Sequence, residues 1–164
     1  MIDKKSSKKI SRRKLLSISK KSLNATLAEL KLLEFFKGCE VSIFVCDNLE
    51  IKKINRKYRK KNKPTNVLSF PFLEFYNGKY LGNKKLFSAL PKPQIIGEII
   101  ISLEKCFEES ETQNIPFYNH LTHLFIHSIL HILGFDHERN DSDAEIMENL
   151  EGKILKTLKI KKPL

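Results

Sequence analysis

Apolar and polar residues recur along the chain with two different periods, and the change of period predicts where strands and helices lie. Three short apolar runs, rich in β-branched residues, predict strands at 41–45, 66–72 and 95–102. Around them, apolar residues at helical spacing predict helices at 13–37, 48–60, 103–113, 117–133 and 143–159. Because strands and helices interleave, we predict an α+β (mixed α/β) fold built on one small mixed sheet.

Particular residues mark the predicted ends of these elements. Gly38 is a candidate C-cap of the first helix, and Asp47 is a candidate N-cap of the second. Gly134 follows the fourth helix and predicts its end. Ser142 and Glu145 form a capping box, which predicts where the last helix begins.

Length and composition fit one folded domain. The chain has 164 residues, of which 41% are hydrophobic, enough to bury a sizeable core. No apolar run approaches the roughly 20 residues that a membrane span needs. No apolar signal-peptide core follows the basic N-terminus, so we expect a cytoplasmic protein without membrane association. We predict a basic, disordered tail at 1–14 and a single catalytic domain at 15–160, in which 76–93 is a loop or an irregular hairpin.

The cysteines indicate no disulfide framework. Cys39, Cys46 and Cys106 are odd in number and widely spaced, and they form no CxxC pair. This pattern also disfavours a zinc site built from thiolates. We expect Cys46 and Cys106, in or beside apolar runs, to be inert packing residues.

The positive charge is concentrated in two segments. The net charge is +11, and residues 1–21 and 51–63 each contribute a net +8, which leaves a negative remainder. Clustered Lys and Arg are the electrostatic mark of a protein that binds a polyanion. The N-terminal cluster is equally compatible with an ordinary basic tail. The cluster at 51–63 lies inside the predicted domain, which favours a functional role.

Three histidines stand in the apolar stretch HSILHILGFDH, residues 127–137. His127 and His131 are four residues apart, so on a helix they share one face. A left-handed turn at Gly134 would bring His137 back toward that face. Catalytic zinc sites commonly use three protein ligands and leave one position for water. The sequence therefore predicts a metal site at His127, His131 and His137.

The polar neighbours of this stretch allow more than one interpretation. His123, one helical turn before His127, can support the metal site, contact substrate or simply be a polar group at the helix edge. His120 lies a further turn away, and we assign it no function. Asp136 can orient an imidazole or cap the turn after the helix.

The spacing HxxxHxxGxxH also matches the metzincin protease motif HExxHxxGxxH, with one difference. The glutamate that acts as general base in those proteases would fall at position 128, where this chain has Ser128. A serine without a base partner cannot replace that carboxylate. A metzincin-like zinc site is thus predicted without the usual protease activity.

Together these residues resemble the YbeY family, bacterial zinc-dependent endoribonucleases linked to ribosomal RNA maturation. The family signature HGxLHLxGYDH is matched by HSILHILGFDH, and the block YRxxxxxTNVLSFPF is matched by YRKKNKPTNVLSFPF at 58–72. A third block, GDIxI, is matched at 97–101, and the acidic final helix EIMENLE also fits. The blocks occur in family order over about residues 41–155. The chain departs from the family pattern at Ser128, Glu98 and Phe135, where the family has Gly, Asp and Tyr, and in its long basic N-terminal tail.

The resemblance implies a YbeY-like fold with a central metal-binding helix and one Zn²⁺ ion held by His127, His131 and His137. It implies a hydrolase in which a zinc-activated water cleaves phosphodiester bonds of single-stranded RNA. Ribosomal RNA processing in the small subunit and ribosome quality control are the implied roles, with ribosomal RNA and small-subunit assembly proteins as partners. Arg59 and His127 are the candidate catalytic residues. A guanidinium can fork onto two phosphate oxygens and stabilise charge in the transition state.

Substrate binding is assigned to the basic residues around Arg59 and to one histidine: Arg56, Lys57, Lys60, Lys61 and His123. Thr65, Asn66 and Ser69 can hydrogen-bond the site or RNA, or they can cap turns and satisfy strand ends.

Two other classes of function remain compatible with the sequence. One is a zinc hydrolase with another substrate class, such as a peptidase or amidase. The missing carboxylate at position 128 and the positive charge disfavour it. The other is a non-catalytic factor for ribosome assembly or RNA binding with a structural metal. Structural zinc sites usually use four protein ligands, whereas three histidines at suitable spacing are evident here.

Overall fold

A computed structural model describes residues 10–160 of the chain and confirms the mixed α/β class. Its main sheet has three strands in the order β1–β5–β2. The central strand β5 (Gln94–Ser102) runs parallel to β1 (Cys39–Cys46) and antiparallel to β2 (Val67–Pro71), so the sheet is mixed as predicted. All three predicted strands are present. Ile99, Ile100 and Ile101 of β5 are all buried, because both faces of the sheet are covered.

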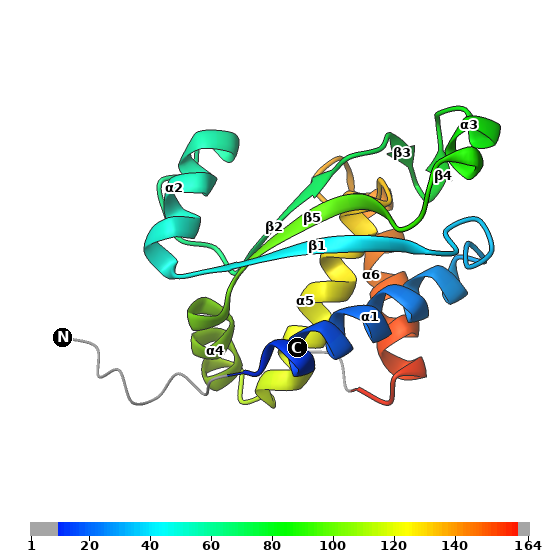
Figure 1. Ribbon diagram of the computed structural model, residues 1–164. Coiled ribbons are helices and arrows are strands. Elements are labelled where there is room, and N and C mark those ends of the chain that lie inside the picture. Colours follow the sequence, from blue (N-terminus) through cyan, green and yellow to red (C-terminus); the bar gives the residue numbers. More distant parts are fainter. Residues whose placement is uncertain (1–9, 161–164) are drawn as a thin grey trace.

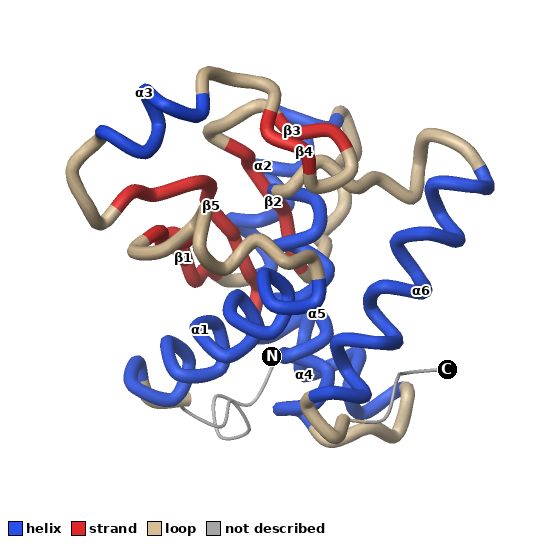
Figure 2. The backbone as a smooth tube through the Cα atoms, turned by 90° about the vertical axis from the view of Figure 1, so that its right-hand side faces the viewer, coloured by secondary structure: helices blue, strands red, loops and turns tan. Residues whose placement is uncertain are grey.

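Helices lie on both sides of the sheet (Figure 1). The central helix is α5 (Phe117–Ile132), which packs against β2 and β5 and is flanked by α1 (Arg12–Glu29), α4 (Leu103–Thr112) and α6 (Asp141–Thr157). Figure 2 shows α5 between α1 and α6, beneath the strands. Most residues of α5 are buried, while His123, His127 and His131 lie along one partly exposed stripe.

Helix α2 (Asn48–Arg59) lies on the opposite face and carries the basic segment. It packs through Ile51, which forms a small buried cluster with Leu68 and Ile100. The predicted cap is confirmed, since the backbone N–H of Glu50 donates to Asp47 Oδ1 at 2.7 Å. The apolar side of α2 is thus held on the sheet, while its basic side chains face outward.

Two predicted helix boundaries were wrong. The first helix ends at Glu29 and not near Gly38, because Lys31 adopts a left-handed conformation that breaks the helical path. The last helix begins at Asp141, capped by Asn140 and not by Ser142. Asn140 and Asp143 bond reciprocally, with the Asp143 N–H donating to Asn140 Oδ1 at 2.9 Å, and this competing cap prevails.

The segment 76–93 contains the hairpin that was one of the two predicted alternatives, and also a helix that was not predicted. Strands β3 (Phe75–Tyr76) and β4 (Lys79–Tyr80) form the hairpin, and α3 (Lys84–Ala89) follows it. Phe87 of α3 is buried against Phe35 and Tyr80, an aromatic contact that no local sequence period indicates.

The basic tail predicted at 1–14 overlaps the residues that the structure describes. Residues 1–9 lie outside the described residues, but Ile10 packs against the core and Ser11 caps α1, accepting from the Lys14 N–H at 3.2 Å. Among the helices between residues 10 and 160, none is long and apolar enough to cross a membrane.

All three cysteines are free thiols. Burial, followed by the nearby Glu109 carboxylate, raises the pKa of the Cys106 thiol to about 12. Burial, followed by the carboxylates of Glu50 and Asp47, raises the pKa of Cys46 to about 11. Both side chains therefore stay protonated and unreactive near neutral pH, as expected for packing residues.

Candidate metal centre and its cavity

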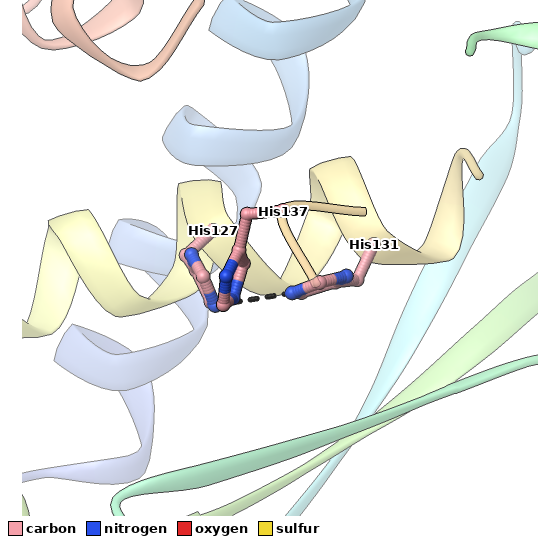
Figure 3. Close-up of side chains that lie close together, drawn as sticks. All are labelled: His127, His131 and His137. Carbon is pink, nitrogen blue, oxygen red and sulfur yellow. Dashed lines mark hydrogen bonds between the residues drawn. The ribbon is translucent and has the colours of Figure 1, made fainter. Parts of the chain in front are cut away.

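The three predicted metal-binding histidines converge on one point. His127 and His131 project from the same face of α5, and His137 returns to them from the loop after the helix (Figure 3). One ring nitrogen of each lies within 4.8 Å of the other two. The Nε2 atoms of His127 and His131 are 3.2 Å apart. Two of the rings are half-buried and that of His137 is exposed, so the point is open to solvent on one side.

A tight turn at Gly134 brings His137 back. Gly134 has a φ of +81°, and its N–H donates to the His131 carbonyl at 3.0 Å, as at the left-handed end of a helix. The β3–β4 hairpin braces this turn, because the Asn77 N–H donates to the Gly134 carbonyl at 3.2 Å. A Cβ atom at position 134 would lie 2.3 Å from the carbonyl oxygen of Phe75. Only glycine fits both the conformation and the space.

A buried carboxylate that the sequence did not reveal lies behind the histidines. Glu151 of α6 contacts His127 Nδ1 through Oε1 at 2.7 Å and His123 Nε2 through Oε2 at 3.0 Å. Burial alone would raise the pKa of Glu151, but hydrogen bonds and charge interactions with the two histidines lower it to about 2. Glu151 is therefore ionised and accepts both hydrogen bonds. A signal did exist in the sequence, since Glu151 lies on the buried stripe of α6 between Met147 and Leu155.

The protonation of the imidazoles suits metal binding. Burial, followed by the neighbouring His127 and His137, lowers the pKa of His131 to about 4. His131 is thus neutral at physiological pH, the form in which imidazole binds metals. Since Glu151 accepts from Nδ1 of His127, the lone pair of that ring is left on Nε2, which faces His131. Three such nitrogens form a donor set that suits zinc and several other transition metals.

The histidines line a cavity of about 520 Å³ between α5, β2 and the end of α2. Arg59, the last residue of α2, lines the same cavity, as does Ser69 of β2. The Arg59 guanidinium donates through Nη2 to Glu138 Oε2, and Lys61 lies 3.5 Å from Oε1 of the same carboxylate. Arg59 and Glu138, which are 79 positions apart in the sequence, therefore meet at the edge of the cavity.

The other predicted substrate-binding residues lie outside this cavity. Arg56, Lys57 and Lys60 are exposed on α2 and its C-terminal turn. Lys57 Nζ lies 5.0 Å from the centre of the Tyr58 ring. His123 does not line the cavity, because its Nε2 atom is directed to Glu151.

Asp136 and Asn66, two of the polar residues with two interpretations, make structural hydrogen bonds. Asp136 lines the cavity, but its Oδ1 accepts from the Glu138 N–H at 2.9 Å and so caps the turn. Asn66 ties the start of β2 to α4, donating to Glu109 Oε2 at 2.9 Å. His120, to which no function was assigned, is buried and lies 3.0 Å from the same oxygen.

Ser128, where the family signature has Gly, is directed away from the site. Its side chain is fully buried, and it does not line the cavity. Its hydroxyl has no hydrogen-bond partner among residues 10–160. The serine therefore neither crowds the three histidines nor adds a hydroxyl to them.

Arg139, a further cavity residue that the sequence did not single out, fixes the loop after His137. Its Nη2 donates to the Gly134 carbonyl at 3.0 Å and to Asn77 Oδ1 at 2.7 Å, while its Nε lies 3.1 Å from Asp143 Oδ2. Arg139 thus joins the helix-ending turn, the β3–β4 hairpin and the start of α6. Its place two residues after the histidine motif was a signal available in the sequence.

Comparisons with known proteins agree with the resemblance seen in the sequence. The sequence profile of one family, described as Endoribonuclease YbeY, matches residues 1–159. A protein named Endoribonuclease YbeY from Bartonella bacilliformis is 38% identical over 149 residues, covering 91% of this chain and 85% of the relative. Another of that name, from Ehrlichia canis, is 42% identical over 151 residues, covering 92% and 86%. A Thermotoga maritima protein with a known solution structure shares the fold, with a TM-score of 0.52 and 23% identity, over 92% of this chain and 87% of that one.

Proposed function

The chain belongs to the endoribonuclease YbeY family, and from this premise we propose that it is a zinc-dependent endoribonuclease acting on single-stranded RNA. The observation that carries the proposal is the cavity in which three imidazole nitrogens meet opposite an arginine at the end of a basic helix. Relatives bearing the endoribonuclease name cover nearly the whole domain. We propose the same reaction class here, a hydrolase that cleaves phosphodiester bonds.

His127, His131 and His137 would hold the metal. Zinc supplies a Lewis acid and activates water near neutral pH. Glu151 keeps the Nε2 lone pair of His127 directed to the cavity, and the low pKa of His131 keeps that ring neutral. An open fourth position is expected, because only these three side chains converge there among residues 10–160.

Arg59 is proposed to act on the scissile phosphate. Its guanidinium carries five N–H donors, and the contact with Glu138 engages Nη2. Donors on the remaining nitrogens can bind phosphate oxygens and stabilise the charge that develops on them. Because Arg59 and Glu138 are each nearly half exposed, an incoming phosphate can reach and displace this ion pair.

The exposed basic face of α2 is proposed to bind the RNA backbone beside the cavity. Arg56, Lys57, Lys60 and Lys61 extend the positive charge outward from Arg59. We do not extend this role to His123, which contacts Glu151. We propose small-subunit ribosomal RNA as the substrate, assembly proteins of that subunit as partners, and the cytoplasm as the site of action.

The test compares wild type, His131→Ala and Arg59→Ala, purified identically, in cleavage of single-stranded RNA and in zinc content per chain. Wild type should cut and carry about one zinc ion, which is the expected load of one three-histidine site. His131→Ala should lose both the zinc and the cleavage. Arg59→Ala should keep the zinc and lose most of the cleavage.

Two results would refute the proposal. Equal cleavage by all three proteins would identify the activity as a contaminant. Zinc without cleavage in wild type, on free RNA and on small-subunit particles alike, would favour a non-catalytic assembly factor.

A further inference from the structure

We infer that Glu151 is a positioning residue of the metal site, whose carboxylate fixes His127 in the tautomer and orientation that present Nε2 to the metal. The inference rests on the proposed metal site, and it assigns a role to a residue on a different helix from the histidines. Glu151 does not line the cavity and would touch neither metal nor substrate. Its effect would pass through His127.

The geometry leaves Glu151 little freedom. Its side chain is 9% exposed, and its two oxygens are held by two different histidines. Oε1 lies 2.7 Å from His127 Nδ1, and Oε2 lies 3.0 Å from His123 Nε2. Since the carboxylate is held at both oxygens, it constrains the direction in which the His127 Nδ1–H bond points. Precise ring orientation matters because a metal ligand must direct its lone pair at the ion.

The chemistry of the carboxylate selects one tautomer of His127. Both Glu151 oxygens face imidazole nitrogens, at 2.7 and 3.0 Å, and carboxylate oxygens accept hydrogen bonds, so the contacting Nδ1 carries the proton. In a neutral imidazole the other nitrogen, Nε2, then bears the lone pair. That nitrogen is the one 3.2 Å from His131 Nε2, at the convergence point. Without Glu151, both tautomers become available, and the one protonated on Nε2 presents no lone pair to the convergence point.

Replacement by glutamine separates tautomer selection from simple packing. Glutamine has nearly the same shape, but it can accept from only one of the two histidines and must donate to the other. If it donates to His127 Nδ1, the proton of that ring moves to Nε2 and blocks the metal. If it donates to His123 Nε2, the proton of His123 moves to Nδ1, a buried atom that has no partner among residues 10–160. Either arrangement is unfavourable, so an isosteric change should still weaken the site.

The experiment measures zinc affinity by chelator competition for wild type, Glu151→Ala, Glu151→Gln and the control Glu145→Gln. Glu145 is an exposed acid on the same helix, so its change alters charge equally without touching a histidine. Loss of a carboxylate behind a metal-binding histidine typically weakens affinity roughly 10- to 100-fold. We expect that loss for Glu151→Ala, a smaller but clear loss for Glu151→Gln, and no change for Glu145→Gln. Thermal unfolding of each zinc-free protein verifies that the variants are folded.

A second readout needs no metal. Nitrogen NMR of the imidazole rings in zinc-free protein reports which nitrogen of His127 is protonated. Wild type should hold the proton on Nδ1, and Glu151→Ala should shift the population toward Nε2. A folded Glu151→Ala protein with wild-type zinc affinity and an unchanged His127 tautomer would overturn the inference. Wild type that holds the Nδ1 proton, yet binds no zinc, would instead refute the proposed metal site and leave the tautomer assignment standing.

Discussion

Replacement of Gly134 by alanine should damage both the stability of the domain and its metal site. Gly134 has a φ of +81°, a conformation that costs an L-residue roughly 1–2 kcal/mol. The new Cβ would also lie 2.3 Å from the Phe75 carbonyl oxygen and 2.8 Å from the Phe75 Cβ atom. Such overpacking typically costs about 1–3 kcal/mol. The hairpin backbone cannot yield easily, because the Asn77 N–H is bonded to the Gly134 carbonyl.

The two effects together predict a loss of about 2–5 kcal/mol in the free energy of unfolding. Urea unfolding of zinc-free protein, followed by circular dichroism, measures it. For a domain of this size the melting temperature should fall by roughly 4–20 °C. Zinc affinity should fall too, since the Gly134 turn is what brings His137 to the other two histidines.

Gly152 provides the matched control. It lies inside α6, and a Cβ atom there would meet nothing within 4 Å. Gly152→Ala should therefore stabilise the protein by about 0.5–1 kcal/mol, through the higher helix propensity of alanine. A Gly134→Ala protein within about 0.5 kcal/mol of wild type, the usual range of harmless surface changes, would refute the reasoning.

Four further predictions follow from the same geometry. Arg59→Ala should lower the rate of RNA cleavage by roughly 10²- to 10³-fold with zinc content unchanged, and Arg59→Lys should restore only part of it, since lysine lacks the planar fork. Lys57→Ala and Lys60→Ala should each reduce the salt dependence of RNA affinity, measured as the slope of log K against log salt, by about 0.7. Ser128→Ala should raise the free energy of unfolding by about 1 kcal/mol in urea titrations, because it removes a buried hydroxyl without a partner among the described residues. Glu109→Gln should lower the free energy of unfolding near neutral pH. In urea titrations, the difference in that free energy from wild type should narrow as the pH falls below about 4.5, the ordinary pKa of that carboxyl.

The sign of the Glu109 effect follows from its pKa. Burial alone would raise that pKa, but hydrogen bonds with His120 and Asn66 lower it below the usual value. A carboxylate of this kind stabilises the fold above its unfolded-state pKa, and the stabilisation disappears as pH falls through the folded-state pKa. A difference in the free energy of unfolding between wild type and Glu109→Gln that stays constant from pH 7 to pH 3 would contradict this account.

The other three predictions have their own contrary outcomes. Loss of zinc in Arg59→Ala would mean that the arginine acts on the fold and not on the phosphate. Salt slopes that match wild type in both lysine variants would place the RNA path away from α2. A destabilised Ser128→Ala protein would mean that its hydroxyl has a partner after all.

Local sequence patterns were sufficient to predict much of the fold. The three strands were predicted because β-branched apolar runs have few alternatives, and the Asp47 cap because its hydrogen bond is made three residues away. The spacing of His127 and His131 fixed their common face, since helical geometry decides it without reference to the rest of the chain. The conformational freedom of Gly134 likewise predicted the turn.

The sequence alone was insufficient to predict an element where two local signals compete, or where the residue that it packs against is distant in the chain. Asn140 and Ser142 are both good caps, and the pairing of Asp143 with both Asn140 and Arg139 decided between them. Helix α3 went unpredicted because its buried residue, Phe87, packs against Phe35, which lies far away in the chain.

The sequence by itself determined which residues could bind a metal, because periodicity and a single turn relate His127, His131 and His137 over only 11 residues. Only the tertiary structure decided what surrounds them. Arg59 reaches the cavity because α2 packs on the sheet through Ile51, and Glu151 reaches His127 because α6 packs against α5. No local period links positions separated by 24 to 79 residues. Their contact depends on the packing of a common core, and that core forms only when the whole chain folds.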